Sequence, residues 1–205
     1  MPYSIQLIRK NEQTTNEWSG GLTTQLAIYP EDADYTERNF KWRISSAIVE
    51  FEESVFTPLP DINRLIMVID GEMTLKHEGH HHVHLKPYEQ DRFNGGWTTR
   101  SFGKVRDFNL MLAEGCSGDL EAITVEKGGY HETVNPKNPD GHQIAEAFYC
   151  INGPVHITIG DQAAIDLEEG DFILLNREHL ETSSSITLFN RAEAEANVIR
   201  ASVIF

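Results

Sequence analysis

The chain of 205 residues carries 17 lysines and arginines against 32 aspartates and glutamates, which leaves a formal net charge of -15 at pH 7. This charge repels nucleic-acid backbones and anionic membrane surfaces at long range, so neither is an expected partner. With 40% apolar residues, the composition is that of an ordinary globular protein that can bury one large core or two small ones.

Short segments rich in valine, isoleucine, phenylalanine and threonine recur between clusters of turn-forming residues, a pattern typical of an all-β sandwich or barrel. Strands are predicted in the first part of the chain at residues 4–9, 23–29, 41–49, 65–69, 72–77, 81–85, 98–102, 108–113 and 121–125. After a polar passage they are predicted at residues 147–151, 155–159, 162–167, 171–175, 185–189 and 198–205. The stretch 191–197, RAEAEAN, is too short to hold a helix alone and is predicted to be a hairpin loop.

The N-terminal stretch, MPYSIQLIRKNEQTTNEW, lacks the apolar segment of a signal peptide, and no part of the chain approaches the roughly 18 apolar residues of a membrane span. We therefore expect a cytoplasmic protein. Cys116 and Cys150 lie far apart and form no CxxC pair, so inert free thiols are expected rather than a disulfide framework or a thiolate zinc site.

The second half of the chain repeats the order of the first. LIMVIDGEMTL (65–75) and AFYCINGPVHITI (147–159) each join two apolar runs through a glycine turn, and LKPYEQDRF (85–93) and LEEGDFILL (167–175) each place a turn before another strand. This order predicts duplicated β-barrel units.

Four ordered motifs, WSGGLTTQLAIYP, FKWRISSAIV, PLPDINRLIMVIDG and VRDFNLM, resemble the HutD/Ves family of bicupin proteins, which are often encoded with histidine-utilisation genes. The resemblance covers roughly residues 1–125 closely and the remainder loosely. It implies two cupin-like β-barrels in one chain, which we place at residues 1–127 and 128–205. It implies no defined reaction; binding of a small metabolite and regulation of histidine breakdown are the usual proposals.

The stretch GHHHVHLKPYEQDRFNGG (79–96) has the spacing of a cupin metal motif, since His82 and His84 are followed by Glu89 and Gly96. It lies after the glycine turn, however, and so is out of register with the cupin motif. By strand alternation His80, His82 and His84 share one face, and His81, Val83 and Leu85 share the other. We interpret the histidines of the first group as a solvated hairpin tip.

In register, the final glycine of the cupin metal motif corresponds to Gly71, which places Arg64 where the ligand glutamate would stand and Pro60 and Pro58 where the two histidines would stand. No metal can use this set, so no cofactor is expected in the first barrel. The same count from Gly153 gives the set Glu146, His142 and Asp140, and a further histidine, His179, follows Gly170 two positions earlier than the cupin pattern requires. Structural histidines and surface carboxylates are the alternative to a metal in this second barrel.

An arginine in place of a ligand glutamate turns a cation site into an anion site, so Arg64 predicts a carboxylate-bearing ligand. Arg106 alternates with Phe108, Leu110 and Leu112, the face that we expect to be buried. Arg43 is a third candidate whose face the alternation does not assign. The alternative for each arginine is an internal salt bridge.

Other residues could complete a pocket around these arginines. Trp18, Phe93 and Trp97 could stack on a planar ligand or belong to the core, and Thr23 and Asn109 could supply neutral hydrogen bonds. The stretch SGGLT (19–23) lacks the strand-to-helix context of a phosphate loop and is predicted to be a turn.

These observations favour a regulator of histidine or urocanate utilisation that binds a small carboxylate, such as urocanate or formylglutamate. One alternative is a metal-dependent cupin enzyme, an isomerase or hydrolase, that uses His142 and Glu146. Another is a non-catalytic interaction module in which all arginines are paired internally. The missing first-barrel ligands favour binding over catalysis, and the sequence leaves a homodimer open.

Overall fold

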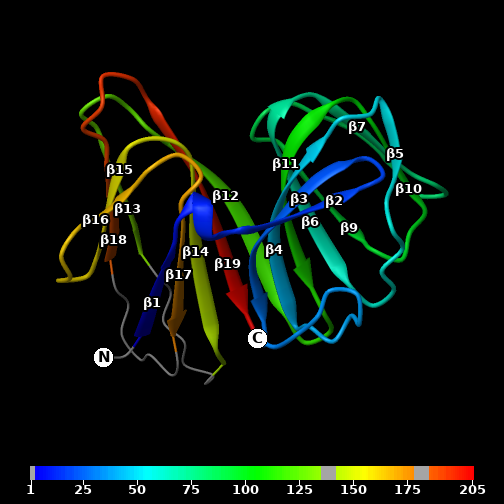
Figure 1. Cartoon of the computed structure of the whole chain (residues 1–205), viewed down its shortest axis with the longest axis horizontal. Coiled ribbons are helices and arrows are strands. Elements are labelled where there is room, and N and C mark those ends of the chain that lie inside the picture. The colour runs from blue at the N-terminus through cyan, green and yellow to red at the C-terminus, as the bar shows by residue number, and fades with distance from the viewer. Residues whose placement is uncertain (1–2, 135–141, 178–184) are drawn as a thin grey trace. The chain divides into compact units, whose positions relative to one another are not determined.

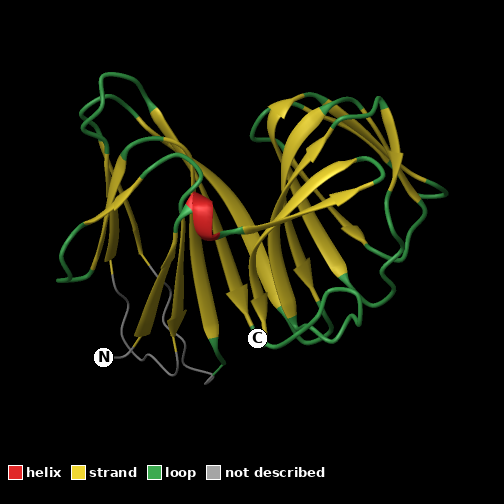
Figure 2. Cartoon of the chain, viewed as in Figure 1, coloured by secondary structure: helices red, strands yellow, loops and turns green. Residues whose placement is uncertain are grey.

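The computed structural model describes residues 3–134, 142–177 and 185–205 (Figure 1). In these ranges the regular elements are β-strands, apart from the 3-10 turn η1 (Lys10–Glu12) that is drawn in red in Figure 2. The prediction of an all-β chain is therefore confirmed. Within the same ranges, no helix has the length and apolar character needed to cross a membrane.

The chain divides into two compact units, one formed by Gln13–Leu120 and one by Met1–Glu12 together with Glu121–Phe205. We call them the 13–120 unit and the terminal unit. Strand β1 (Tyr3–Ile8) pairs antiparallel with β17 (Phe172–Arg177), so the N-terminal residues group with the end of the chain. The sequence prediction had placed them in the first barrel, because strand pairing across such a distance leaves no local signal.

Two sheets form the 13–120 unit. The six-stranded sheet has the order β2 (Thr14–Trp18), β3 (Gly21–Tyr29), β4 (Trp42–Val49), β11 (Val105–Leu112), β6 (Asn63–Gly71) and β9 (Gln90–Asn94). The four-stranded sheet has the order β5 (Glu53–Val55), β10 (Thr99–Phe102), β7 (Met73–His77) and β8 (His82–Leu85). Both sheets contribute to one apolar core, which includes Ile66 and Val68 from the first and Met73 and Leu75 from the second.

The terminal unit repeats this plan. One sheet has the order β1, β17, β14 (Ile144–Asn152), β19 (Ala196–Ile204) and β12 (Ser117–Val125), and the other has the order β13 (Tyr130–Val134), β18 (Ser185–Phe189), β15 (Val155–Ile159) and β16 (Ile165–Leu167). The core between them includes Phe148 and Ile173 from the first sheet and Ile157 and Leu188 from the second.

The repeated sequence order has a structural counterpart. In the 13–120 unit β6 pairs with β9 and β7 pairs with β8, and in the terminal unit β14 pairs with β17 and β15 pairs with β16. Consecutive strands of each glycine-turn hairpin thus enter opposite sheets. Among the described strands, however, each sheet begins and ends with a different strand, so no sheet closes on itself, and the predicted pair of cupin-like barrels is not confirmed.

Candidate anion-binding site

Two buried arginines lie on the same face of the six-stranded sheet. Arg43 in β4 and Arg64 in β6 are both in register with Met111 of β11, the strand between them. Residues in register project to the same side of a sheet, so the two side chains leave it together. Their exposed fractions are 5% and 6%. Arginine is almost never buried to this extent without a compensating group.

The Arg64 guanidinium is held by one amide and two aromatic rings. Its Nη2 donates a hydrogen bond of 2.8 Å to Asn109 Oδ1, and its carbon lies 4.6 Å from the ring centre of Phe56 and 5.3 Å from that of Phe93. The buried Nε has no hydrogen-bond partner among the described residues. In the same part of the chain no carboxylate forms an ion pair with this guanidinium.

The Arg43 guanidinium also makes only neutral contacts within the described residues. Its Nε donates a hydrogen bond of 2.9 Å to Gln25 Oε1, its Nη1 donates one of 3.1 Å to Ser45 Oγ, and its carbon lies 4.4 Å from the ring centre of Tyr35. Burial lowers the pKa of Arg43. Since these partners carry no negative charge, the positive charge remains uncompensated by direct contact.

The carboxylate whose charge acts on Arg64 is that of Asp107, which is 2% exposed and is linked to Arg64 through Asn109. Asn109 Nδ2 donates a hydrogen bond of 2.9 Å to Asp107 Oδ1, while Asn109 Oδ1 accepts from Arg64. Burial raises the pKa of Asp107 to about 6, although Asn109 and Arg64 act against this rise. Burial lowers the pKa of Arg64 to about 10. The charge of Arg43 also lowers this pKa, whereas Tyr35 and Asp107 raise it.

At neutral pH this interior therefore holds two guanidinium charges and one carboxylate charge. The excess is positive, and several N–H donors of the arginines make no hydrogen bond in the described part of the chain. Such an arrangement suits an anion that accepts two hydrogen bonds side by side.

The structure brings together four of the residues predicted for the ligand site, which are Arg43, Arg64, Phe93 and Asn109. Thr23 lies two residues from Gln25 on β3, on the same face. Trp18, in contrast, is 39% exposed and lines a surface depression with Gly20 and Phe51.

Arg106 lies on the opposite face of β11 from Asp107 and Asn109. Its neighbour in register is Ile48, which is 46% exposed. The sequence prediction chose the apolar face of Phe108 as the ligand face, whereas the arginine pair lies on the face that also carries polar residues. Alternation groups residues into faces but does not say which face lines the site.

Sequence reasoning missed several residues that contact or influence the arginines. These are Gln25, Tyr35, Ser45, Phe56 and Asp107. Asp107 had a usable signal, because it alternates with Asn109 and is an acidic residue within an apolar strand. Ser45 lies on β4, two residues from Arg43, whereas Gln25, Tyr35 and Phe56 come from another strand and from loops.

Of the residues considered for a metal site in the second barrel, the structure describes Glu146 and His142. Glu146 is fully buried, and its carboxylate accepts hydrogen bonds from Arg200 Nε at 2.8 Å and Ser202 Oγ at 2.9 Å. His142 is exposed. Asp140 and His179 lie outside the described residues. Glu146 is thus an internal ion-pair partner, because a buried carboxylate needs a cation.

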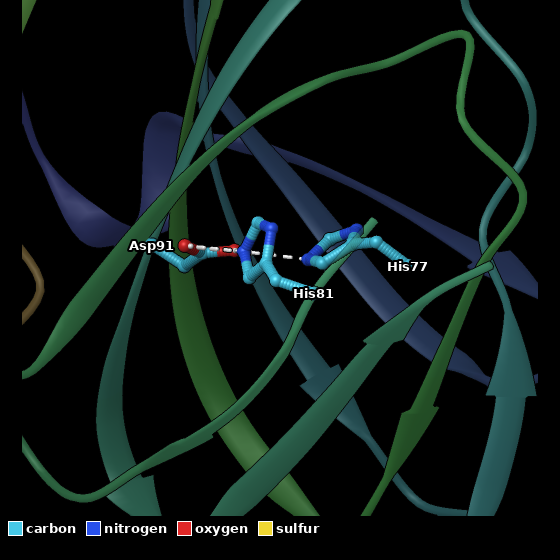
Figure 3. A group of neighbouring side chains, drawn as sticks. All are labelled: His77, His81 and Asp91. Carbon is cyan, nitrogen blue, oxygen red and sulfur yellow. Dashed lines mark hydrogen bonds and ion pairs between the residues drawn. The ribbon is translucent and has the colours of Figure 1, made fainter. Parts of the chain in front are cut away.

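The histidine-rich hairpin is divided between solvent and interior. His80, His82 and His84 are exposed, as their alternation predicts. His81 turns the other way and meets His77 and Asp91, so that the three side chains point toward one another (Figure 3). The sequence prediction named neither His77 nor Asp91.

We expect replacement of His80, His82 and His84 by serine to change the free energy of unfolding by no more than about 0.5 kcal/mol per site, because exposed side chains lose little on substitution. Chemical denaturation of the wild type and the triple variant measures the change. A loss of several kcal/mol would show that these three side chains are structural.

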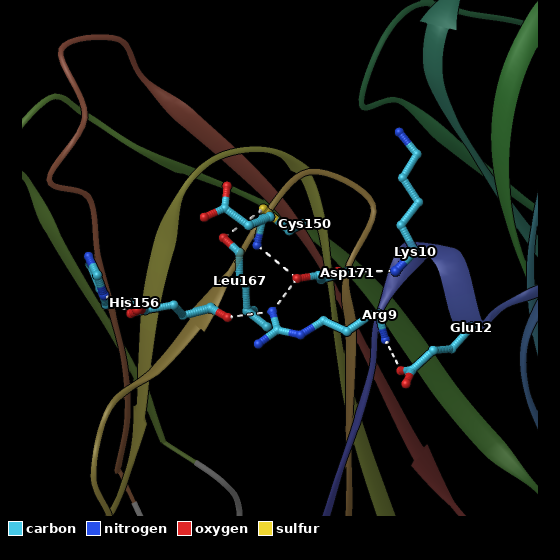
Figure 4. Close-up of polar contacts among 9 residues, drawn as sticks. Arg9, Lys10, Glu12, Cys150, His156, Leu167 and Asp171 are labelled. Atoms are coloured by element: carbon cyan, nitrogen blue, oxygen red, sulfur yellow. Dashed lines mark hydrogen bonds and ion pairs between the residues drawn. The ribbon is translucent and has the colours of Figure 1, made fainter.

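A second polar group lies in the terminal unit and is satisfied internally. Arg9 Nη1 forms an ion pair of 2.5 Å with Asp171 Oδ2, and the Lys10 backbone N–H donates a hydrogen bond of 3.1 Å to Asp171 Oδ1 (Figure 4).

Burial, with the charges of Asp171 and two neighbouring glutamates, raises the pKa of the Cys150 thiol to about 12. Cys150 and Cys116 are both free, and Cys150 remains protonated at neutral pH.

Comparison with known proteins finds one family and several similar structures. The family model described as HutD matches residues 10–194. The conserved protein of unknown function PA5104 from Pseudomonas aeruginosa PAO1 is 22% identical with a TM-score of 0.80, over 98% of both chains. HutD from Pseudomonas fluorescens SBW25, in a formate condition, is 20% identical with a TM-score of 0.67, over 97% of this chain and 98% of that one.

A more distant similarity is to the vicilin from Solanum melongena, which is described with different anionic ligands in structurally similar pockets. It is 9% identical with a TM-score of 0.61, over 96% of this chain and 84% of that one. At these identities the structural matches show a shared cupin-like fold. No protein with a curated description matches the chain significantly.

Proposed function

Since this chain belongs to the HutD family, we propose that it binds a small carboxylate metabolite through Arg64 and Arg43 of the 13–120 unit. Family membership fits a protein associated with histidine utilisation, and we propose a regulatory role there, exerted by binding and not by catalysis. The observation that carries the proposal is the buried Arg64 guanidinium, which has no carboxylate partner among the described residues and an Nε without an acceptor.

The charges and donors of the site favour a carboxylate over a neutral ligand. A carboxylate would compensate the positive excess of the two arginines and accept hydrogen bonds from N–H groups that the described residues leave unused. Arg64 is buried beside the rings of Phe56 and Phe93, and charge interactions are stronger in such an apolar environment than in water. A neutral ligand would leave the excess charge in place.

We draw support for this ligand class from the descriptions of two similar structures. The HutD protein from Pseudomonas fluorescens is described in a formate condition, and the Solanum melongena vicilin is described with different anionic ligands in structurally similar pockets. Formate is the smallest carboxylate. The acids of histidine breakdown, urocanate and formylglutamate, are larger members of the same class and are our first candidates.

Calorimetric titration of the wild-type protein tests the proposal. Urocanate, formylglutamate and formate are each compared with the corresponding amide, which has similar size and no charge. Binding of at least one acid, with its amide bound much more weakly, is the expected result. If no acid binds, or if acids and amides bind equally, the arginines serve the fold and the chain acts as an interaction module.

We expect the affinity for an aliphatic carboxylate to rise as the pH falls toward about 6 and to level off below it. The pKa of Asp107 is about 6 without ligand, and a bound anion raises it further, so binding takes up a proton. Titrations in two buffers of different ionisation enthalpy measure this uptake. The Asp107→Asn variant should bind with little pH dependence; an unchanged pH profile in this variant would assign the proton to another group.

A further inference from the structure

His77, His81 and Asp91 bring three metal-ligating groups together in the 13–120 unit (Figure 3). His77 ends β7 in the four-stranded sheet, His81 lies in the turn before β8, and Asp91 belongs to β9 in the six-stranded sheet. The group therefore depends on both sheets of the unit. It includes none of the residues that contact Arg43 or Arg64, although the Phe93 ring lies 4.5 Å from the His77 ring.

The ligand atoms converge on one point. His77 Nε2 lies 2.9 Å from Asp91 Oδ2, and His81 Nε2 lies 3.1 Å from Asp91 Oδ1 and 3.2 Å from Oδ2. One nitrogen of each imidazole and one carboxylate oxygen all lie within 4.8 Å of one another. Ligands at about 2.0–2.2 Å from a zinc ion are separated from one another by distances of this order, so small side-chain movements would admit an ion.

The other nitrogen of His77 is oriented by a buried hydroxyl. Its Nδ1 is hydrogen-bonded to Thr99 Oγ1 at 2.8 Å, and both residues are fully buried. This contact fixes the imidazole with Nε2 toward Asp91, as the partners of metal-ligating histidines commonly do. Rings of Phe93 and Trp97 contact the His77 imidazole and limit its movement.

The site is closed on the His77 side and open on the His81 side. The His77 side chain is fully buried, whereas those of His81 and Asp91 are 40% and 13% exposed. An ion could enter past His81 and keep at least one position for water or a ligand. Two imidazoles and one carboxylate with an open position form the donor set of many catalytic and regulatory metal centres.

We propose that His77, His81 and Asp91 bind one divalent transition-metal ion of the group that accepts imidazole nitrogen and carboxylate oxygen, such as Zn²⁺, Co²⁺ or Fe²⁺. The chain offers no thiolate here, and the small number of carboxylates disfavours Ca²⁺ and Mg²⁺. The proposed metal ligands differ from the residues proposed to bind the carboxylate, although the Phe93 ring packs against both His77 and Arg64.

The test uses tag-free full-length protein, stripped with chelator and titrated with Co²⁺, whose visible absorption reports the number and type of ligands. We expect one Co²⁺ per chain, displaced by Zn²⁺. Loss of a group that only orients a metal ligand typically weakens metal binding by about 10- to 100-fold. His81→Ala and Asp91→Asn each remove a ligand itself, so each should weaken Co²⁺ binding by more than this factor. His81 is partly exposed, so His81→Ala should fold normally, and circular dichroism checks both variants.

The matched control is the double variant His82→Ser and His84→Ser, which removes two exposed histidines from the same hairpin. It should bind Co²⁺ as the wild type does. Loss of binding in this control, or unchanged binding in folded His81→Ala and Asp91→Asn, would overturn the assignment. Absence of stoichiometric binding by the wild type would show that the three side chains form a hydrogen-bonded group only.

Discussion

Replacing Arg64 by methionine should weaken carboxylate binding by about 10- to 150-fold. This factor corresponds to the loss of one charge-assisted hydrogen bond of about 1.5–3 kcal/mol. The free energy of unfolding without ligand should stay within about 1 kcal/mol of the wild type. Methionine fills a similar volume and removes an uncompensated buried charge, which offsets the lost hydrogen bond to Asn109. Calorimetric titration and denaturant unfolding of the same variant measure both quantities.

Two controls separate the possible outcomes for Arg64. Arg100→Met removes an exposed arginine that pairs with Glu53 and Glu78 at the surface, and it should leave binding unchanged. Arg106→Ala tests the face that sequence reasoning had favoured, and it too should leave affinity nearly unchanged. A loss of several kcal/mol in the stability of Arg64→Met, with no carboxylate bound by the wild type, would contradict a ligand site.

Replacing Glu146 by alanine should lower the free energy of unfolding by about 3–5 kcal/mol, which is the largest stability effect that we expect from any single substitution discussed above. Glu146 is fully buried and accepts hydrogen bonds from Arg200 and Ser202. Removing one partner of a buried ion pair leaves the other charge poorly compensated in a medium of low dielectric constant. Denaturant unfolding followed by circular dichroism measures the loss.

Glu121→Ala is the matched control, because Glu121 pairs with the same Arg200 at 3.3 Å but is about half exposed. Exposed ion pairs contribute about 0–1 kcal/mol, so this variant should unfold almost as the wild type does. If Glu146→Ala and Glu121→Ala lost equal stability, the buried pair would have no special role. If Glu146→Ala instead removed a bound metal, the alternative of a metal site in the second barrel would be supported.

The histidine hairpin illustrates how far sequence reasoning reaches toward a site. Alternation separated His80, His82 and His84 from His81, and the structure shows the first three exposed. It did not connect His81 to its partners, because His77 lies on the preceding strand and Asp91 belongs to the other sheet of the unit. Contacts between two sheets depend on how they pack, which no local periodicity encodes.

By itself the sequence determined the all-β class and the repeated order of strands, and it marked Arg64 as a candidate ligand-binding residue. These follow from local patterns: strand-forming runs between turn residues, glycine turns at repeated positions, and an arginine where a related motif has a glutamate. Only the tertiary structure decided that Arg43 joins Arg64, that Arg106 lies on the other face of β11, and that Glu146 is paired with Arg200. A period of two residues sorts side chains into two faces, but the pairing and packing of distant strands determine which face is buried and what it meets.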